Sequence, residues 1–96
     1  MKYYIVTFDR EPNRTYGAFH DDFVKHPGFR HWWHYIKSSY IIGTDLDSKA
    51  ISNYFTAVAE KHKFPVTHLV LQVELSSRYG RLVKEAWEWI KQNTRI

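Results

Sequence analysis

The stretch HWWHYIKSSYIIGTD (31–45) combines two histidines, two adjacent tryptophans and several further large side chains. Aromatic and β-branched residues are enriched in strands, so this composition predicts two strands, over 31–36 and 39–44, that bend around Lys37 and Ser38. Three interpretations of its side chains are open at this point: a metal site, a surface that stacks on bases, or a sheet that is apolar on both faces.

Residue patterns before and after this pair of strands predict five further elements. They are a strand over 2–9, a helix from Thr15 to the sequence His26-Pro27-Gly28, a helix beginning at Asp47, a strand over 65–75 and a final helix after Gly80. We expect Gly28 to end the first helix in the left-handed conformation, and Asp47 to cap the free amides of the second. Val83, Ala86, Trp87 and Ile90 are expected on the apolar side of the last helix.

This order of elements predicts an α+β class and a single domain over 1–96. The expected architecture is the ferredoxin-like βαββαβ pattern, an antiparallel sheet with helices on one face, plus a C-terminal helix. Large apolar side chains nevertheless point to both faces of the strands, since Trp33 opposes Trp32 and Leu69 opposes Val70. The second face therefore needs a cover, either a second copy of the chain or a stacked base.

The bulk composition indicates one small domain with an acidic partner. The chain has 96 residues, 44% of them hydrophobic, which suffices for one modest core and excludes a disordered protein. It has no cysteine, which excludes disulfides and Cys-ligated zinc. A net charge of +4 favours nucleic acid or a nucleotide as partner, with charge for solubility as the alternative. No apolar run is long enough for a signal peptide or a membrane span, so we expect a cytoplasmic protein without membrane contact.

Asp9 ends the first predicted strand and is followed closely by Arg10 and Arg14. A carboxylate at a strand end can bind Mg²⁺, and arginines beside it can hold a phosphodiester. One carboxylate is a poor metal site, but a twofold axis nearby would pair it with its copy. Asp9 is therefore the candidate catalytic and metal-binding residue, and the structural alternative is an aspartate that starts a turn.

The histidines are weaker metal candidates. His31 and His34 are three residues apart on a strand, which puts them on opposite faces. His20, Asp21 and Asp22 could supply ligands from the first helix, but His20 lies beside an apolar stripe and the two aspartates are more simply a solvated face. The adjacent tryptophans are then either sheet and interface packing or a stacking platform for a single strand.

A second basic group lies near the C-terminus. Its members are Arg78, Arg81, Lys84, Lys91 and Arg95. Phosphate contacts by such side chains release counterions, so binding through this group would weaken steeply with salt. Arg78, Arg81 and Lys84 are therefore candidate nucleic-acid-binding residues.

Three stretches resemble a known family. YYIVTFD (3–9), WWHYIKSSYIIGTDL (32–46) and YGRLVKEAWEWI (79–90) are similar to the SinR-like small proteins, which are Cas-two-like and distinct from the sporulation regulator of that name. The match covers nearly the whole chain. More remotely, these proteins are similar to the CRISPR-associated Cas-two proteins and the VapD toxins.

The resemblance implies a ferredoxin-like homodimer in which Asp9 takes the position of the metal-binding aspartate of Cas-two proteins, with a looser correspondence at Ser38. Some members of that wider family are Mg²⁺-dependent endonucleases on RNA or DNA, and others are structural dimers that bind nucleic acid. The chain differs from the Cas-two pattern after Asp9, where REPNRTYG (10–17) replaces a basic, helix-opening run.

We predict a Cas-two-like homodimer that binds nucleic acid, with Mg²⁺-dependent endonuclease activity left open. The alternative is a non-catalytic interaction module, an accessory or inhibitor of a phage or bacterial defence system, that binds a protein or a small nucleotide. Salt-dependent binding distinguishes the first function, because it rests on phosphate contacts. Recovery of one stoichiometric protein partner would favour the second.

Overall fold

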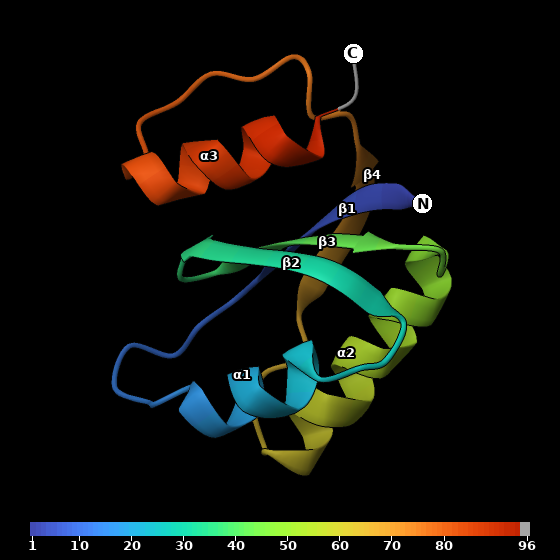
Figure 1. Ribbon diagram of the computed structural model, residues 1–96. Coiled ribbons are helices and arrows are strands. Elements are labelled where there is room, and N and C mark those ends of the chain that lie inside the picture. Colours follow the sequence, from blue (N-terminus) through green and yellow to red (C-terminus); the bar gives the residue numbers. More distant parts are fainter. Residues whose placement is uncertain (95–96) are drawn as a thin grey trace.

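The computed structural model describes residues 1–94, which form four strands and three helices (Figure 1). In chain order these are β1 (Lys2–Phe8), α1 (Gly17–Val24), β2 (Phe29–Ile36), β3 (Ser39–Thr44), α2 (Ser48–Lys61), β4 (His68–Val73) and α3 (Lys84–Asn93). The predicted α+β class is confirmed, and each predicted element is present with ends that differ by a few residues. Within this range every helix is too short or too polar to cross a membrane.

The four strands form one antiparallel sheet in the order β2-β3-β1-β4. β1 is paired on both sides, with Val6 facing Tyr40 of β3 and Val70 of β4, which suits its aromatic and β-branched residues. The turn between β2 and β3 lies at 37–38, as predicted, and the Phe8 N–H donates to the Ser38 carbonyl oxygen at 3.0 Å. β2 and β4 are the two edges of the sheet.

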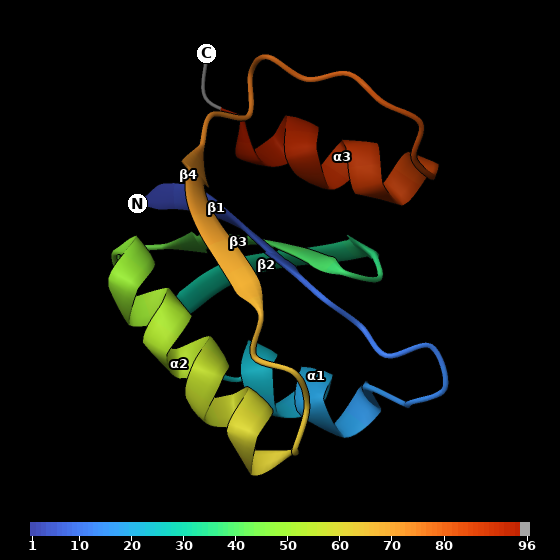
Figure 2. The same cartoon turned by 180° about the vertical axis from the view of Figure 1, so that it is seen from behind.

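Helices α1 and α2 cover one face of the sheet and enclose the main core (Figures 1 and 2). Alternate residues of β1 and β3 point into it, together with apolar residues of α2: Tyr4, Val6, Phe8, Tyr40, Ile42, Ile51 and Val58. Phe19 and Phe23 of α1 contact Phe55 of α2, with ring centroids 5.3 and 5.6 Å apart. Asp47 caps α2 as predicted, since its carboxylate accepts the Ala50 N–H at 2.8 Å.

Helix α3 lies on the opposite face of the sheet (Figures 1 and 2). Its Ala86 and Ile90 are buried against Trp33 and Ile41, and the Trp33 Nε1–H donates to the Ala86 carbonyl oxygen at 3.2 Å. The expectation of helices on one face only, with the other open, is therefore wrong. The apolar stripe of α3 and the second apolar face of the strands bury each other within one chain.

The cover that α3 provides is partial. Leu69 and Leu71 of β4 remain 52% and 51% exposed on the second face. The two adjacent tryptophans also differ: Trp33 is 3% exposed beneath α3, whereas Trp32, on the face of α1, is 41% exposed. Sheet packing thus accounts for one tryptophan of the pair and leaves the other at the surface.

Two local expectations are wrong. Gly28 does not adopt a positive φ; among residues 1–94, only Lys63 does, with a φ of 59°. Gly28 is instead closely packed, because a Cβ there would lie 3.1 Å from the His26 ring and 3.2 Å from Leu46, so these side chains would have to shift slightly. Val83 is the N-cap residue of α3 and is 58% exposed, so it does not belong to the buried side of that helix.

Candidate nucleic-acid interface

Asp9 lies directly after β1, with its side chain exposed and its N–H donating to the Thr67 carbonyl oxygen at 3.1 Å. With Thr7, Thr67 and Leu69 it lines a shallow groove of about 220 Å³. Across residues 1–94, no group of three or more His, Asp or Glu is placed to hold a metal ion. Asp9 is the one carboxylate among the residues that line this groove, so a second carboxylate for a Mg²⁺ ion there would have to come from outside it.

Arg10 and Ser38 lie together at the same end of the sheet. The Arg10 guanidinium donates to the Lys37 carbonyl oxygen at 3.2 Å and lies 4.2 Å from the centre of the Tyr16 ring. A groove of about 440 Å³ runs between the loop after β1 and the β2–β3 turn, and both residues line it. The structure thus brings Arg10 and Ser38 into one groove next to Asp9.

Two of the predicted basic residues, Arg14 and Arg78, have partners within the fold. Arg14 pairs with Glu11 at 3.2 Å, and its guanidinium lies 4.4 Å from the centre of the Phe64 ring. Arg78 donates to the Leu75 carbonyl oxygen at 3.0 Å and to the Thr94 hydroxyl at 2.9 Å. Arg95, named with the C-terminal basic group, lies outside the described residues.

Lys84 is the first residue of α3 and Arg81 lies in the segment just before it, and both are exposed. The hydrogen bond from Trp33 to Ala86 holds this first turn over β2, so the N-terminus of α3 lies above the β2–β3 turn (Figure 1). Lys84 has its Nζ 3.8 Å from the Glu88 carboxylate. A lysine at a helix N-terminus also sits at the positive end of the helix dipole, so its charge does not serve the stability of α3.

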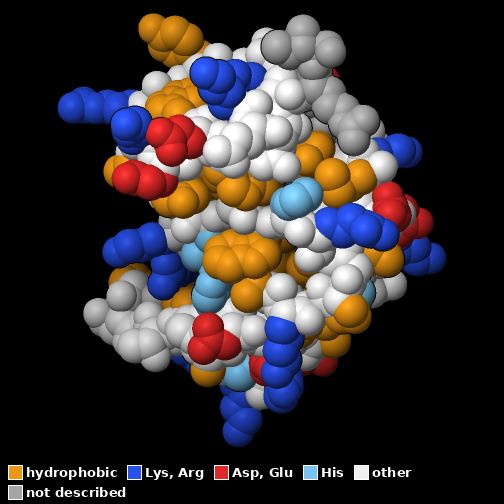
Figure 3. Space-filling model, in the orientation of Figure 1, with side chains coloured by type: hydrophobic (Ala, Val, Ile, Leu, Met, Phe, Trp, Pro, Cys, Tyr) orange, Lys and Arg blue, Asp and Glu red, His pale blue; other side chains and the backbone are white. Residues whose placement is uncertain are grey.

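These residues define a basic edge, made up of Arg10, Lys37, Arg81 and Lys84. In Figure 3, Lys and Arg side chains lie at two levels along the left edge of the molecule, beside the start of α3, where acidic side chains lie among them, and beside the β2–β3 turn. Tyr35 and Ile36, at the end of β2, are 47% and 46% exposed. Cationic groups around exposed apolar surface are the combination that single-stranded nucleic acid requires.

A second feature, the histidine–tryptophan cluster, consists of His20, Trp32, His34 and Tyr40. It lies between α1 and β2, next to Arg10. The His34 ring stacks on Tyr40 with centroids 4.0 Å apart, and the His20 ring lies 5.2 Å from His34 and 5.0 Å from Trp32. The Tyr40 hydroxyl and His20 Nδ1 are 2.9 Å apart. Trp32 and His34 are two residues apart on one strand, so alternation could have placed them on one face, but His20 was expected beside the apolar stripe of α1.

Burial lowers the pKa of His34 in this cluster, an effect that the hydrogen bond to Ser39 opposes and the neighbouring His20 and Arg10 side chains strengthen. His34 Nδ1 lies 2.9 Å from the Ser39 carbonyl oxygen, which can only accept, so Nδ1 carries the proton and Nε2 of the neutral ring is an acceptor. Burial also raises the pKa of the Tyr40 hydroxyl, which stays protonated.

Asp22, expected on a solvated face, instead joins the two helices of the main core. Its carboxylate lies 2.6 Å from His62 Nε2, 2.8 Å from Lys25 Nζ and 3.0 Å from Lys61 Nζ. Hydrogen bonds from Lys25, then His62, then Lys61 hold the pKa of this carboxyl well below its ordinary range. The expectation for Asp22 is therefore wrong, whereas Asp21 beside it is exposed.

Asp22→Asn is expected to lower the midpoint of thermal unfolding near pH 7 and to have little effect in acid. Because the pKa of Asp22 is lower in the folded state than its unfolded value of about 3.9, its charge stabilises the fold above about pH 4, and the contribution is lost as pH falls below that. Circular dichroism melts at about pH 7 and about pH 2 measure this difference. Asp21→Asn is the matched control, and an equal effect of both variants at neutral pH would contradict the assignment.

A further hydroxyl–imidazole pair docks β4 on α2. The Ser52 Oγ lies 2.7 Å from His68 Nε2, while His68 Nδ1 bonds to the Val66 carbonyl oxygen. The His68 ring also packs on Phe55, with centroids 4.4 Å apart. The spacing of these residues in the sequence gave no signal for the pair, which forms only when the fold brings the two elements together.

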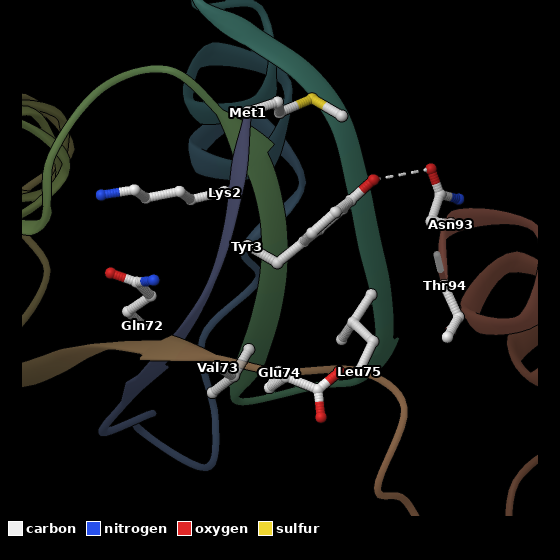
Figure 4. A pocket seen from close by; sticks show the side chains of 9 residues that line it. All are labelled: Met1, Lys2, Tyr3, Gln72, Val73, Glu74, Leu75, Asn93 and Thr94. Atoms are coloured by element: carbon white, nitrogen blue, oxygen red, sulfur yellow. Dashed lines mark hydrogen bonds between the residues drawn. The ribbon is translucent and has the colours of Figure 1, made fainter. Parts of the chain in front are cut away.

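A pocket of about 230 Å³ lies between the start of β1, the end of β4 and the end of α3 (Figure 4). The Tyr3 ring crosses this region, and its hydroxyl donates to Asn93 Oδ1 at 3.0 Å. The residues that line the pocket are Met1, Lys2, Tyr3, Gln72, Val73, Glu74, Leu75, Asn93 and Thr94. They include none of the site residues that the sequence predicts, so the pocket is separate from the basic edge.

No protein-family model, curated protein sequence or solved structure matches the chain. The similarity to SinR-like and Cas-two proteins therefore stays a prediction.

Proposed function

We propose that this chain is a Cas-two-like, homodimeric nucleic-acid-binding protein. The observation that carries the proposal is the basic edge, where Arg10, Lys37, Arg81 and Lys84 come from three separate parts of the chain. Nucleic acid presents a dense row of phosphates, and neutralising them releases counterions, so three exposed cations, Lys37, Arg81 and Lys84, together with the half-buried Arg10, favour this partner. The alternation of β1-α1-β2-β3-α2-β4 and the antiparallel sheet support a ferredoxin-like domain with α3 added on its second face.

Residues that face solvent without a strong partner support the same proposal. The Lys84 side chain is 84% exposed, and its distance of 3.8 Å to Glu88 is long for an ion pair. Exposed pairs of this kind contribute little to stability. The charge of Lys84 is thus available to a phosphate, in contrast to Arg14, which pairs with Glu11 and packs on Phe64.

The homodimer is proposed from the second face of the sheet. Leu69 and Leu71 are half exposed on β4, an edge strand with no Asp, Glu, Lys or Arg between His68 and Val73. Edge strands of monomers are commonly protected by charges or proline, and this one is not. A second copy of the chain on this face would cover both leucines.

Cleavage is a separate question from binding. Asp9 supplies one carboxylate next to the basic edge, and the Mg²⁺ ion that the resemblance implies would need a second carboxylate from the other protomer. Thr7 and Thr67 in the same groove offer neutral oxygen atoms only. Binding is therefore the proposed function, and Mg²⁺-dependent cleavage stays a prediction of the resemblance.

The double variant Arg81→Gln, Lys84→Gln is expected to weaken binding to a fluorescein-labelled oligonucleotide and to flatten its salt dependence. Each lost phosphate contact should reduce the slope of log K against log[salt] by about 1. Fluorescence anisotropy titrations over a series of NaCl concentrations measure both quantities.

Lys49→Gln is the matched control, because Lys49 is exposed in the first turn of α2, away from the basic edge. The proposal fails if the control weakens binding as much as the double variant, or if binding does not respond to salt. Sedimentation velocity on the same samples should give twice the chain mass of 11.6 kDa, and a monomer at binding concentrations would remove the homodimer.

A further inference from the structure

We infer that the histidine–tryptophan cluster is a subsite for one unpaired nucleotide of a single strand, with Trp32 stacking on the base and His20, His34 and Arg10 contacting its phosphate. This inference rests on the proposed function and deepens it, since it names single-stranded nucleic acid as the ligand class. The cluster and the basic edge share Arg10, so one strand can lie across both.

Trp32 has the exposure that a stacking platform requires. It is 41% exposed, although it lies on the same face as the main core and its neighbour Trp33 is buried. His20 meets the Trp32 ring almost at right angles, at 77°, and so supports it from one side only. An exposed indole held in place in this way offers its free surface to a base, and stacking of this kind tolerates any base because each has a π-face.

The imidazoles beside Trp32 form a site suited to an anion. His20 and His34 lie nearly parallel, at 21°, and Tyr40 contacts both rings. A Tyr40 hydroxyl that donates to His20 Nδ1 leaves the His20 proton on Nε2, available as a donor. Within residues 1–94, no carboxylate pairs with either ring, and the Arg10 charge reaches His34.

The location of Trp32 favours an unpaired base over a duplex. It lies on β2, the edge strand, on the side of the sheet that α1 covers. Duplex bases present only their edges in the grooves, because their faces are stacked on each other. A base can therefore place its face on Trp32 only if it has left the stack or was never in one.

Proton uptake should accompany binding of the phosphate. His34 is neutral at pH 7, because burial lowers its pKa. The charged and titratable groups around the His34–Tyr40 pair are His20 and Asp21 on α1 and Arg10 in the loop after β1. A bound phosphate favours the protonated ring, so affinity should rise as pH falls from about 7.5 to about 5.5.

The first test compares a labelled oligothymidylate with a hairpin duplex of equal phosphate number, by fluorescence anisotropy. Wild-type protein should bind the single strand more tightly than the duplex, and Trp32→Ala should weaken single-strand binding about tenfold while leaving duplex binding unchanged. Trp32→Phe should retain most of the affinity. Tyr79→Ala is the matched control, since Tyr79 is an exposed aromatic residue in the segment between β4 and α3 and belongs neither to the basic edge nor to the cluster.

The second test isolates the imidazole. His34→Asn keeps a donor near the position of Nδ1, for the Ser39 carbonyl oxygen, and removes the titratable Nε2. His34→Asn should abolish the rise in affinity that is expected as the pH falls. His31→Asn, a control on the opposite face of β2, should retain that rise.

The outcomes separate the two proposals. If Trp32→Ala binds the single strand like wild type, or if the duplex binds as tightly as the single strand, the inference is overturned while binding through the basic edge stands. If His34→Asn and His31→Asn show the same pH dependence, the phosphate contact is wrong. If wild-type protein binds neither oligonucleotide, the proposed function and the inference fail together.

Discussion

Trp33→Ala is expected to lower the free energy of unfolding by about 3–5 kcal/mol, the range for truncating a large buried aromatic residue. Trp33 is 3% exposed and fills the space between the sheet and α3, where its indole N–H also donates to the Ala86 carbonyl oxygen. Alanine leaves a cavity in the smaller of the two cores and removes the hydrogen bond that joins β2 to the first turn of α3.

The loss of stability in Trp33→Ala should affect mainly α3. This helix has ten residues, and an isolated helix of that length is marginal in water, so it depends on its docking for stability. Hydrogen–deuterium exchange should therefore rise most over Lys84–Asn93, and urea unfolding gives the total loss. Trp32→Ala is the matched control and should cost far less, because that ring is already partly solvated. Equal losses for the two tryptophans would show that α3 is not held as described.

Phe55→Ala is expected to cost a similar amount, about 3–5 kcal/mol, but to destabilise the whole domain. Phe55 is 1% exposed, and its ring contacts Phe8, Phe19 and Phe23 with centroids between 5.3 and 5.6 Å, as well as His68 at 4.4 Å. It thus joins α2 to β1, α1 and β4 at once. Its removal leaves a void that no single element can fill by moving.

Trp33→Ala and Phe55→Ala should therefore lower the free energy of unfolding by similar amounts but differ in which amides exchange faster. With Phe55→Ala, amide exchange should rise in the strands and in both α1 and α2, in one cooperative transition. Phe55→Leu is the conservative control and should retain most of the stability, because it keeps much of the buried volume. Protection that persists in β1 while α2 exchanges freely would contradict the central position given to Phe55.

Much of the fold could be predicted from local patterns. The bend at Lys37 and Ser38, the Asp47 cap and the two-sided apolar character of the strands all depend on residues close in sequence, whose preferences act over a few positions. Boundaries were less accurate. Gly28 was assigned a left-handed helix exit, but its role depends on the His26 ring and on Leu46, which a local pattern does not place.

The candidate site was predicted only in part. Asp9, Arg10 and Ser38 do lie at one end of the sheet, because a strand end and the neighbouring turn meet there. Arg14 is a predicted phosphate contact because it follows Asp9 closely, and Arg78 because it belongs to the C-terminal basic group, but the structure gives both of them partners within the fold. The pairing of His20 with His34 could not be predicted, because it depends on how α1 rotates against the edge of the sheet.

The sequence by itself determined which elements form and which of their faces are apolar, since alternation in strands and the helical repeat are properties of neighbouring residues. Only the tertiary structure decided that α3 covers the second face of its own sheet, with Trp33 beneath it and Lys84 above the β2–β3 turn. An apolar face predicts that it will be buried but does not predict which element will cover it, because the hydrophobic effect is not directional. The partner of each face is fixed by shape and chain connectivity over the whole domain.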